Sequence, residues 1–467
     1  MFDDFINLKK DDIVSAVSKA ISFPSISIET NDSTKPFGKD CMDVLNYVLN
    51  LGKKLGFRVK NIDGYCGYIE FGQGDELLGI IGHLDVVPAD DNWTYSPFQA
   101  TIKDNKLYGR GAIDDKGPVI ASLYAMKAVM DTVKVNKRVR LILGLNEEKS
   151  WKCINYYKDH EEIPTLGFSP DADFPCIYAE KGILTTYIKQ VYNNSYDISI
   201  VDINTNNNAI NVVPKYCSCV LKINTTNINI NDVNSTLNKL ISNYNFNIKF
   251  ETIDNCKIKI ASYGISAHAA HPDLGINSIS RLLIILNDLF TSFNINIPIL
   301  NFFAKYIGLE TDGSSLEINF KDESGNLTLN VGNFSFYNDS IQIGLNLRIP
   351  INTNIENIEN IIQSISCNYK AEIQIVFLGR KEPLYISKND SLVKSLCDIF
   401  NNVTGMKSNP IAIGGATYAR AFENCVSFGA NMPGHEDMCH QVDEYIEIDT
   451  LLLSTKIYAE AIYALSK

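Results

Sequence analysis

The sequence predicts an α/β fold: a mixed, mostly parallel sheet flanked by helices, with an α+β domain inserted into it. Short apolar runs alternate with helical patterns over the first third of the chain. Near residue 191 the composition changes, and Asn, Ile and Ser with β-favouring runs dominate as far as residue 379. Helix and strand patterns then return, which indicates that the C-terminal part completes the first domain.

The first third predicts a βαβ layout. Apolar side chains at helical spacing predict helices over residues 12–23 and 41–56. Three short, uninterrupted apolar runs follow, at residues 77–81, 139–145 and 166–168. Such runs are typical of strands buried on both faces of a parallel sheet. A helical pattern over residues 118–131 lies between the first two, so strand, helix and strand follow one another.

The last stretch predicts two further helices. Asn389 or Asp390 can cap a helix that runs through Phe400 and ends near Gly405. Another helix is expected from about Thr450 to the end of the chain.

These patterns define the expected domains. Residues 1–185 form the first part of one domain, and residues 383–467 form its second part. Residues 186–382 form the inserted domain, which is long enough for two α+β subunits.

Composition and charge limit the partners. The chain has 467 residues, with 42 basic and 54 acidic side chains and a net charge of −12. Nucleic acids and anionic membranes attract basic surfaces, so we expect neither as a partner. No apolar run approaches the ~18 to 20 residues of a membrane helix. The start, MFDDFINLKKDD, has acids where a signal peptide has basic and then apolar residues, and the eleven cysteines are scattered; both features predict a cytoplasmic protein.

Acid-bearing clusters follow the predicted strands or the short turns after them. In chain order they are GHLD at residues 82–85, GRGAIDDKG at 109–117, NEE at 146–148 and SPD at 169–171. Ligands bind beyond the carboxyl ends of the strands in an open parallel sheet. We therefore expect the four clusters to converge on one crevice.

The joint pattern predicts a metal site. Each cluster alone is ordinary, because His-x-Asp is common at surfaces, a Glu-Glu pair is usually a solvated turn and Asp-Asp-Lys-Gly can begin a helix. Together, however, like charges at one edge repel and are costly to desolvate unless cations neutralise them. Carboxylate and imidazole ligands suit zinc, with cobalt or manganese as substitutes.

The motifs resemble the M20 family of metallopeptidases, which includes glutamate carboxypeptidases, aminoacylases, desuccinylases and dipeptidases. The matching segments are GHLDVVP at 82–88, GRGAIDDKGP at 109–118, NEE at 146–148, SPDADFP at 169–175 and His440 in CHQVDE. Similarity to the PepV-type dipeptidases adds WKC at 151–153, GGATYAR at 414–420 and an oversized middle domain. The resemblance covers nearly the whole chain and implies a zinc-peptidase domain with an inserted lid.

The resemblance implies a site for two Zn²⁺. Its five ligands would be Asp114 bridging both ions, His83 and Asp171 on one ion, and Glu148 and His440 on the other. The register of the family motif selects Asp114, whereas the sequence alone leaves Asp114 and Asp115 open. Glu147 would be the general base, and Asp85 would orient an imidazole or tune that base.

The resemblance also implies substrate contacts outside the metal ligands. His268, in the segment SAHAAHP, and Asn211 would hydrogen-bond the oxyanion from the lid. Arg348 would hold the C-terminal carboxylate of the substrate in a two-pronged contact, although a surface arginine at a strand end is an equal alternative. Gly415 and Thr417 would shape the same end of the pocket.

The sequence therefore predicts a zinc-dependent dipeptidase acting on short peptides with a free C-terminus. One alternative is a family deacylase or carboxypeptidase that acts on N-acyl amino acids. Another is a non-catalytic metal- or peptide-binding protein, which the intact Glu147 and ligand set speak against. The resemblance implies that many relatives with a smaller lid dimerise through it, whereas the long insert here predicts a monomer.

Overall fold

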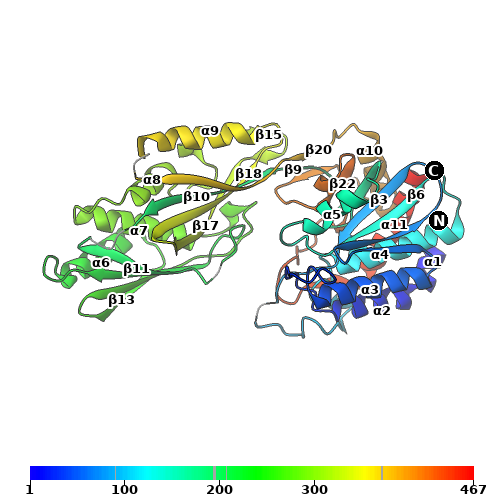
Figure 1. Cartoon of the computed structure of the whole chain (residues 1–467), viewed down its shortest axis with the longest axis horizontal. Helices are drawn as coiled ribbons and strands as arrows, with labels where there is room; N and C mark the ends of the chain where they lie inside the picture. Colours follow the sequence, from blue (N-terminus) through cyan, green and yellow to red (C-terminus); the bar gives the residue numbers. More distant parts are fainter. Residues whose placement is uncertain (90, 193–195, 207, 370–371) are drawn as a thin grey trace. The chain divides into compact units, whose positions relative to one another are not determined.

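The computed structural model describes residues 1–467 except 90, 193–195, 207 and 370–371. It divides into two compact units, which we describe separately. Unit 1 comprises Met1–Ala179, Leu384–Ile411 and Ala416–Lys467, and unit 2 comprises Glu180–Pro383 and Ala412–Gly415. The chain thus leaves unit 1, builds unit 2 and returns (Figure 1). The sequence-based domain boundaries stay predictions.

Unit 1 is built around a nine-stranded mixed sheet in the order β1-β2-β6-β3-β7-β22-β9-β20, with β21 paired to β9. The strands are β1 Arg58–Ile62, β2 Cys66–Phe71, β3 Leu77–His83, β6 Arg138–Gly144, β7 Leu166–Ser169, β9 Ile177–Glu180, β20 Leu384–Tyr385, β21 Ile411–Ile413 and β22 Cys425–Ser427. The central strands β6, β3, β7 and β22 are parallel neighbours. Every residue of β3 is buried, as expected for a strand covered on both faces.

Helices cover this sheet (Figure 1). They are α1 Asp3–Leu8, α2 Lys10–Ile21, α3 Lys39–Lys54, α4 Lys116–Thr132, α5 Lys152–His160, α10 Ser391–Thr404, α11 Ile448–Ser466 and the short η4 Tyr418–Ala421. Two small sheets complete the unit, β24-β5-β4 and β23-β8, with β4 Thr101–Lys103, β5 Lys106–Tyr108, β8 Ala172–Asp173, β23 Ala430–Asn431 and β24 Tyr445–Glu447. The apolar helix α4 connects β3 towards β6 and packs against α11, so the predicted βαβ layout and the predicted α/β class are confirmed.

Unit 2 contains two four-stranded antiparallel sheets, β17-β18-β10-β19 and β11-β12-β14-β13. Their strands are β10 Gly182–Val191, β11 Ile198–Asn204, β12 Tyr216–Ile223, β13 Ile248–Asp254, β14 Lys257–Tyr263, β17 Thr328–Tyr337, β18 Ser340–Ile349 and β19 Gln374–Lys381. The short pieces are β15 Lys321–Asp322, β16 Gly325–Asn326, η1 Pro272–Leu274, η2 Ser314–Leu316 and η3 Cys367–Tyr369. This is an α+β unit, as the sequence predicts for the insert.

The α-helices of unit 2 are α6 Ile230–Tyr244, α7 Ser278–Ser292, α8 Pro298–Tyr306 and α9 Ile355–Ser366, and three of them begin at asparagine caps. The side chains of Asn229, Asn277 and Asn354 accept a hydrogen bond from an N–H in the first turn of α6, α7 and α9. A single apolar core joins both sheets and α7, with Cys217, Leu282 and Ile343 among its members.

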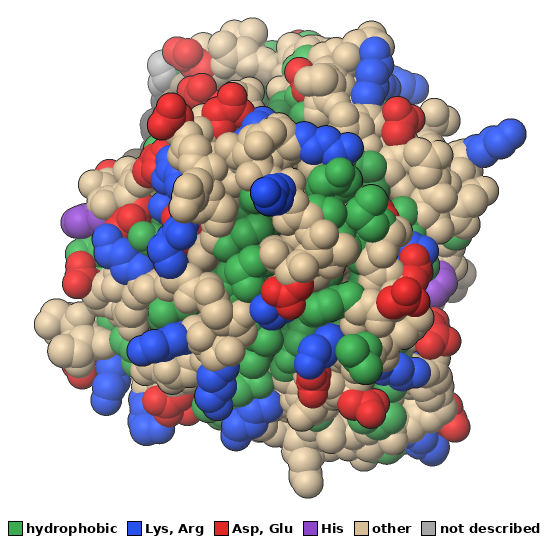
Figure 2. Space-filling view, turned by 90° about the vertical axis from the view of Figure 1, so that its right-hand side faces the viewer, with side chains coloured by type: hydrophobic (Ala, Val, Ile, Leu, Met, Phe, Trp, Pro, Cys, Tyr) green, Lys and Arg blue, Asp and Glu red, His purple; other side chains and the backbone are tan. Residues whose placement is uncertain are grey.

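Two surface features complete the description. Among the described residues, no helix is both long and apolar enough to cross a membrane. The face in Figure 2 mixes acidic and basic side chains around a hydrophobic area near its centre, so the net negative charge is not gathered into one patch there.

Candidate metal centre

The five predicted ligands stand close to the ends of secondary-structure elements of unit 1. His83 is the last residue of β3, Glu148 follows β6 and Asp171 follows β7. Because these strands are parallel neighbours, their carboxyl ends lie along one edge of the sheet. Asp114 stands two residues before α4, and His440 lies in the loop between β23 and β24.

The structure brings these residues together in two groups that share one member. The first group is His83, Asp114 and Asp171, and the second is Asp114, Glu148 and His440. Within each group, one possible ligand atom per residue lies within 4.8 Å of the others. Asp114 divides its carboxylate between them, with Oδ1 3.0 Å from His83 Nε2 and Oδ2 3.0 Å from His440 Nε2. A carboxylate in this position can bridge two cations.

The neighbouring Asp115 has a different role. Its Oδ2 accepts a hydrogen bond from the N–H of His83 at 3.1 Å, and the side chain is fully buried. Gly82 permits this approach, because a Cβ there would lie 2.5 Å from the same oxygen. The geometry therefore favours Asp114 as the shared ligand, the choice that the sequence alone leaves open.

The backbone of Asp85 sets the orientation of the His83 ring. The Nδ1 of His83 lies 2.9 Å from the Asp85 carbonyl oxygen. A carbonyl can only accept, so Nδ1 carries a proton and donates it, and Nε2 faces the acids. Besides its contact with Asp114, Nε2 lies 3.6 Å from Asp171 Oδ2.

The side chain of Asp85 fixes the turn that carries both glutamates. The N–H of Glu147 donates to Oδ1 at 3.1 Å, and the N–H of Glu148 donates to Oδ2 at 3.2 Å. Asp85 is fully buried, so water does not compete for these bonds. The Asp85 side chain therefore holds the backbone of Glu147 and Glu148, while the Asp85 carbonyl holds the ring of His83.

Two further residues support the site without having been assigned a role from the sequence. Asn146, at the start of the same turn, donates from Nδ2 to Ser27 Oγ at 2.8 Å. The ring of Tyr418 packs edge-on against His83 with centroids 6.2 Å apart, and its hydroxyl lies 2.7 Å from Cys153 Sγ. Asn146 lies in the motif NEE and Tyr418 lies in GGATYAR. An amide and a phenol are not typical metal ligands, so neither the residue type nor the spacing in the sequence predicts a role at the site.

Nearby acids raise the pKa of both histidines. For His83, burial acts to lower the pKa, but the surrounding carboxylates, Asp171 foremost, outweigh it and raise the pKa well above its usual value. For His440, burial again acts to lower the pKa, and Glu148 foremost among the acids raises it well above its usual value. The site therefore attracts positive charge at two positions.

The pKa values of the three carboxylates are shifted as well. Burial raises the pKa of Asp171 to about 7 and raises the pKa of Glu148 above its usual value. Burial acts in the same direction on Asp114, but the two imidazoles outweigh it and lower its pKa far below the usual range. Three carboxylates in one buried space are costly unless cations neutralise them. Imidazole nitrogens and carboxylate oxygens in two adjoining groups fit a pair of divalent ions.

The two predicted oxyanion contacts lie on paired loops of unit 2. Val212 forms an antiparallel bridge with His268, and the N–H of Ala269 donates to the Asn211 carbonyl at 2.9 Å. Asn330 of β17 donates from Nδ2 to the carbonyls on either side of Asn211, each at 3.0 Å. The structure thus brings Asn211 and His268 together within unit 2, with the His268 side chain exposed.

Arg348 of β18 lies beside the predicted substrate-binding turn of the same unit. Its Nη1 donates to the Gly414 carbonyl at 2.7 Å, and its Nε donates to Asn346 Oδ1 at 3.0 Å. The side chain is 3% exposed, so it is not the surface arginine of the alternative interpretation. Gly415 directly follows the carbonyl that Arg348 binds.

Thr417 belongs to unit 1 and caps the short helix η4. Its Oγ1 accepts from the N–H of Ala419 at 3.1 Å and lies 2.7 Å from Ser427 Oγ. This threonine therefore anchors the start of η4, which carries Tyr418 against His83.

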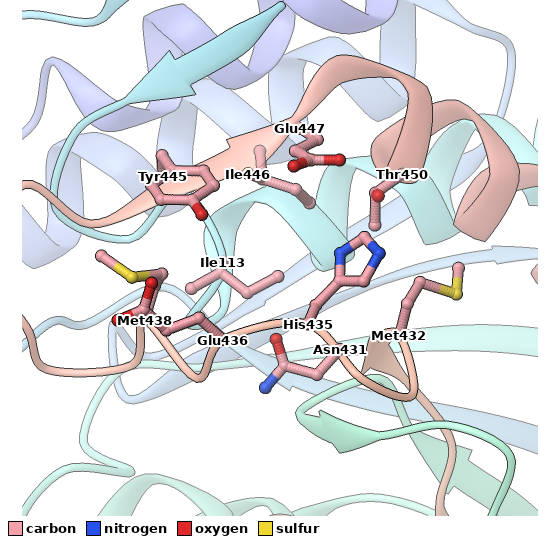
Figure 3. Close-up of a pocket in the computed structure, with 10 residues that line it drawn as sticks. All are labelled: Ile113, Asn431, Met432, His435, Glu436, Met438, Tyr445, Ile446, Glu447 and Thr450. Carbon is pink, nitrogen blue, oxygen red and sulfur yellow. The ribbon is translucent and has the colours of Figure 1, made fainter.

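A small pocket lies beside the loop that carries His440 (Figure 3). It is lined by Ile113, Asn431, Met432, His435, Glu436, Met438, Tyr445, Ile446, Glu447 and Thr450. Its volume of about 20 Å³ has room for about one water molecule. The pocket is too small for a peptide, and the His435 ring forms part of its wall.

Comparisons with known proteins identify the family and the fold of this chain. The model of Peptidase family M20/M25/M40 matches residues 79–464. "Putative dipeptidase YtjP" of Bacillus subtilis (strain 168) is 37% identical over 98% of this chain and 98% of its own, and "Putative dipeptidase" of Staphylococcus epidermidis (strain ATCC 12228 / FDA PCI 1200) is 35% identical over 92% of each. The solved structure of human carnosine dipeptidase 1 aligns with a TM-score of 0.61 at 15% identity, over 99% of this chain and 98% of its own. At that identity the structural likeness concerns the fold.

Proposed function

The chain belongs to peptidase family M20/M25/M40, and from this premise we propose that it is a zinc-dependent dipeptidase. Its substrates are dipeptides and other short peptides with a free C-terminus. The two curated relatives named dipeptidase support this substrate class. The observation that carries the proposal is the position of the Asp114 carboxylate. One of its oxygens faces His83 of the first ligand group, and the other faces His440 of the second.

The metallopeptidase family implies a divalent metal, and we propose two Zn²⁺ per chain. The ligands are His83 and Asp171 for one ion, Glu148 and His440 for the other, and Asp114 for both. Two such ions, when bound, supply positive charge that polarises the scissile carbonyl and makes hydroxide available near neutral pH. Co²⁺ or Mn²⁺ would suit the same nitrogen and oxygen donors.

Glu147 is the general base in this proposal. It takes a proton from the attacking water and later delivers that proton to the leaving amine. The Asp85 carboxylate supports this role, because it holds the N–H groups of Glu147 and Glu148 and fixes the turn between them. Asp85 thereby keeps the base and a ligand in one geometry.

Four residues of unit 2 and Thr417 of unit 1 bind the substrate in this proposal. His268 and Asn211 hydrogen-bond the oxyanion that develops on the attacked carbonyl. Arg348 holds the C-terminal carboxylate, with Gly415 and Thr417 shaping the same end of the pocket. The inserted domain then acts as a lid, which excludes water from the reaction.

The same proposal includes a cytoplasmic, monomeric protein. All eleven cysteines are free thiols, which supports a reducing compartment. The monomer follows from the size of the insert and is developed in the Discussion.

A substrate panel on the purified, metal-stripped protein tests the proposal. Dipeptides, a tripeptide and N-acetyl amino acids are incubated in parallel, with and without added Zn²⁺, and free amino groups are measured with ninhydrin. We expect Zn²⁺-dependent release of amino acids from dipeptides above all. Hydrolysis of N-acetyl amino acids in preference to dipeptides would identify a deacylase instead. Unchanged substrates in every metal-loaded sample would contradict an enzymatic role.

A further inference from the structure

A buried glutamate of unit 1, Glu444, lies at the centre of the loop that presents Asp114. The side chain is 0% exposed. Its Oε2 accepts from the N–H of Gly111 at 3.0 Å, and its Oε1 accepts from the N–H of Ile113 at 3.0 Å and of Asp114 at 3.3 Å. The loop therefore surrounds the Glu444 carboxylate, which also binds the backbone N–H of Asp114, the ligand candidate that both groups share.

Arg110 extends this contact to two other loops. Its Nη1 donates to Glu444 Oε2 at 2.8 Å. Its Nη2 lies 3.4 Å from the carbonyl oxygen of Pro88 and 3.5 Å from the carbonyl oxygen of His440. The Arg110 side chain is 3% exposed. One buried ion pair thus joins the loop of Asp114 to the loop of His440 and to the segment that follows His83.

This placement matters because metal affinity depends on how ligands are held, and residues that hydrogen-bond to ligands tune it strongly. Glu444 does not reach the ligand atoms itself. It holds Asp114 through the backbone N–H of that residue. It is linked to His440 through Arg110, and it also lies four residues after His440 in the same loop.

We propose that Glu444 is a positioning residue that, together with Arg110, holds Asp114 and His440 in register for the Asp114–Glu148–His440 ion. This inference rests on the proposed metal-dependent function. The ion of the His83 group keeps His83 and Asp171, neither of which bonds to Glu444, so loosening the contact should affect the two ions unequally.

A second buried pair in unit 1 provides a matched control. Glu70 of β2 and Arg140 of β6 are 6% and 4% exposed, and Glu70 Oε2 accepts from Arg140 Nε at 2.7 Å. These residues join two strands, and Arg140 also donates from Nη1 to the Tyr157 hydroxyl of α5 at 2.8 Å, so the pair supports the sheet rather than the loops of the ligand groups. Glu70→Gln therefore removes a buried acid of the same kind, with only a structural effect expected.

The experiment compares Glu444→Gln, Glu70→Gln and the unchanged chain. Bound zinc is counted by mass spectrometry after equilibration at a series of buffered free Zn²⁺ concentrations, and metal-free stability is measured in parallel. In Glu444→Gln, an NH₂ group replaces one carboxylate oxygen. This group is a donor, so it cannot accept the hydrogen bonds that the replaced oxygen accepts. We expect about 10- to 100-fold weaker binding of one of the two ions and a smaller loss for the other, which shares Asp114 but keeps His83 and Asp171. Glu70→Gln should bind both ions as the unchanged chain does.

Equal binding of both ions by Glu444→Gln and the unchanged chain would overturn the inference, as would equal weakening of both ions. If Glu444→Gln does not fold, Arg110→Lys decides the question, because it keeps the charge but loses the fork that reaches Pro88 and His440. Normal two-ion binding in that variant would also overturn it. The proposed function fails separately, if the unchanged chain binds no pair of ions or hydrolyses no peptide.

Discussion

Glu147 and Glu148 are adjacent, yet the proposed site gives them different tasks. Both backbones are held by Asp85, so either side chain can be changed while the turn keeps its anchor. We expect Glu147→Gln to retain bound zinc and to lower the turnover rate by ~10²-fold or more, because it removes a positioned acid–base group. Glu148→Gln should lose zinc as well as activity, because His440 Nε2 and Glu148 Oε1, 3.0 Å apart, belong to one ligand group.

Metal content and single-turnover rates, measured on the same preparations, check this assignment. Zinc depletion in Glu147→Gln together with full loading of Glu148→Gln would reverse the two roles. Glu161, which forms an ion pair with Lys60 and lies outside both ligand groups, offers a control in which neither quantity should change.

Arg348 gives a second prediction at this scale. A guanidinium holds a carboxylate through charge-assisted bonds, which a neutral side chain cannot replace. We expect Arg348→Met to raise the Michaelis constant for a free dipeptide by far more than for the corresponding dipeptide amide. Steady-state kinetics on the two substrates measure the difference.

The control is Arg380→Met, which removes an exposed arginine of β19 in the same unit. It should change both Michaelis constants little and to the same extent. Arg348 also bonds to Asn346 and to the Gly414 carbonyl, so its replacement can loosen the turn at Gly415. Equal effects of Arg348→Met on the free dipeptide and the amide would leave only that structural role.

At the scale of the element, helix α10 shows how local signals fix a boundary. The Asp390 side chain accepts from the N–H of Leu392 at 2.8 Å, and Gly405 ends the helix in the left-handed region. Asp390→Ala should cost about 1 kcal/mol of stability. Asp398→Ala, an exposed change within the same helix, should cost less, and thermal unfolding of both variants compares them. Equal losses would mean that the cap bond contributes nothing.

The same helix indicates what a sequence can predict. A cap at Asn389 or Asp390, the end at Gly405 and the buried strands near residues 77, 139 and 166 follow from short-range patterns; the structure has the cap at Asp390 and the other features as predicted. Their order along the chain was enough to place acid-bearing clusters at neighbouring strand ends, because parallel strands end at one edge.

The supporting bonds of the site could not be predicted in this way. Arg110 and Glu444 are 334 positions apart, and Asp85 is 62 positions from Glu147. No periodicity or capping rule connects such distant residues, and a buried carboxylate that accepts backbone N–H groups looks in sequence like any surface acid. Assigning Asp114 rather than Asp115 needed the family motif, and the hydrogen bond that the His83 N–H donates to Asp115 supports that assignment, which stays a prediction.

At the scale of the whole molecule, unit 2 has two four-stranded sheets around one apolar core. The resemblance implies that in many relatives with a smaller lid, the lid pairs with that of a second chain. Here a second sheet belongs to the same chain. We therefore expect a monomer of one chain's mass, 52.1 kDa, over a range of concentrations in sedimentation equilibrium. A concentration-dependent dimer would contradict this.

A monomer also requires that His268 serve the metal centre of its own chain. The test mixes two inactive variants, His268→Ala and Glu147→Gln, each of which keeps the residue that the other lacks. If each chain works alone, no mixture can combine an intact His268 with an intact Glu147, so activity should stay at the level of the separate variants. If the histidine acted between chains, a mixed pair would contain one complete site, and up to a quarter of the normal activity would return at equal ratio on random pairing. Activity regained on mixing, and growing with protein concentration, would show that two chains share the site and that the second sheet does not replace a partner.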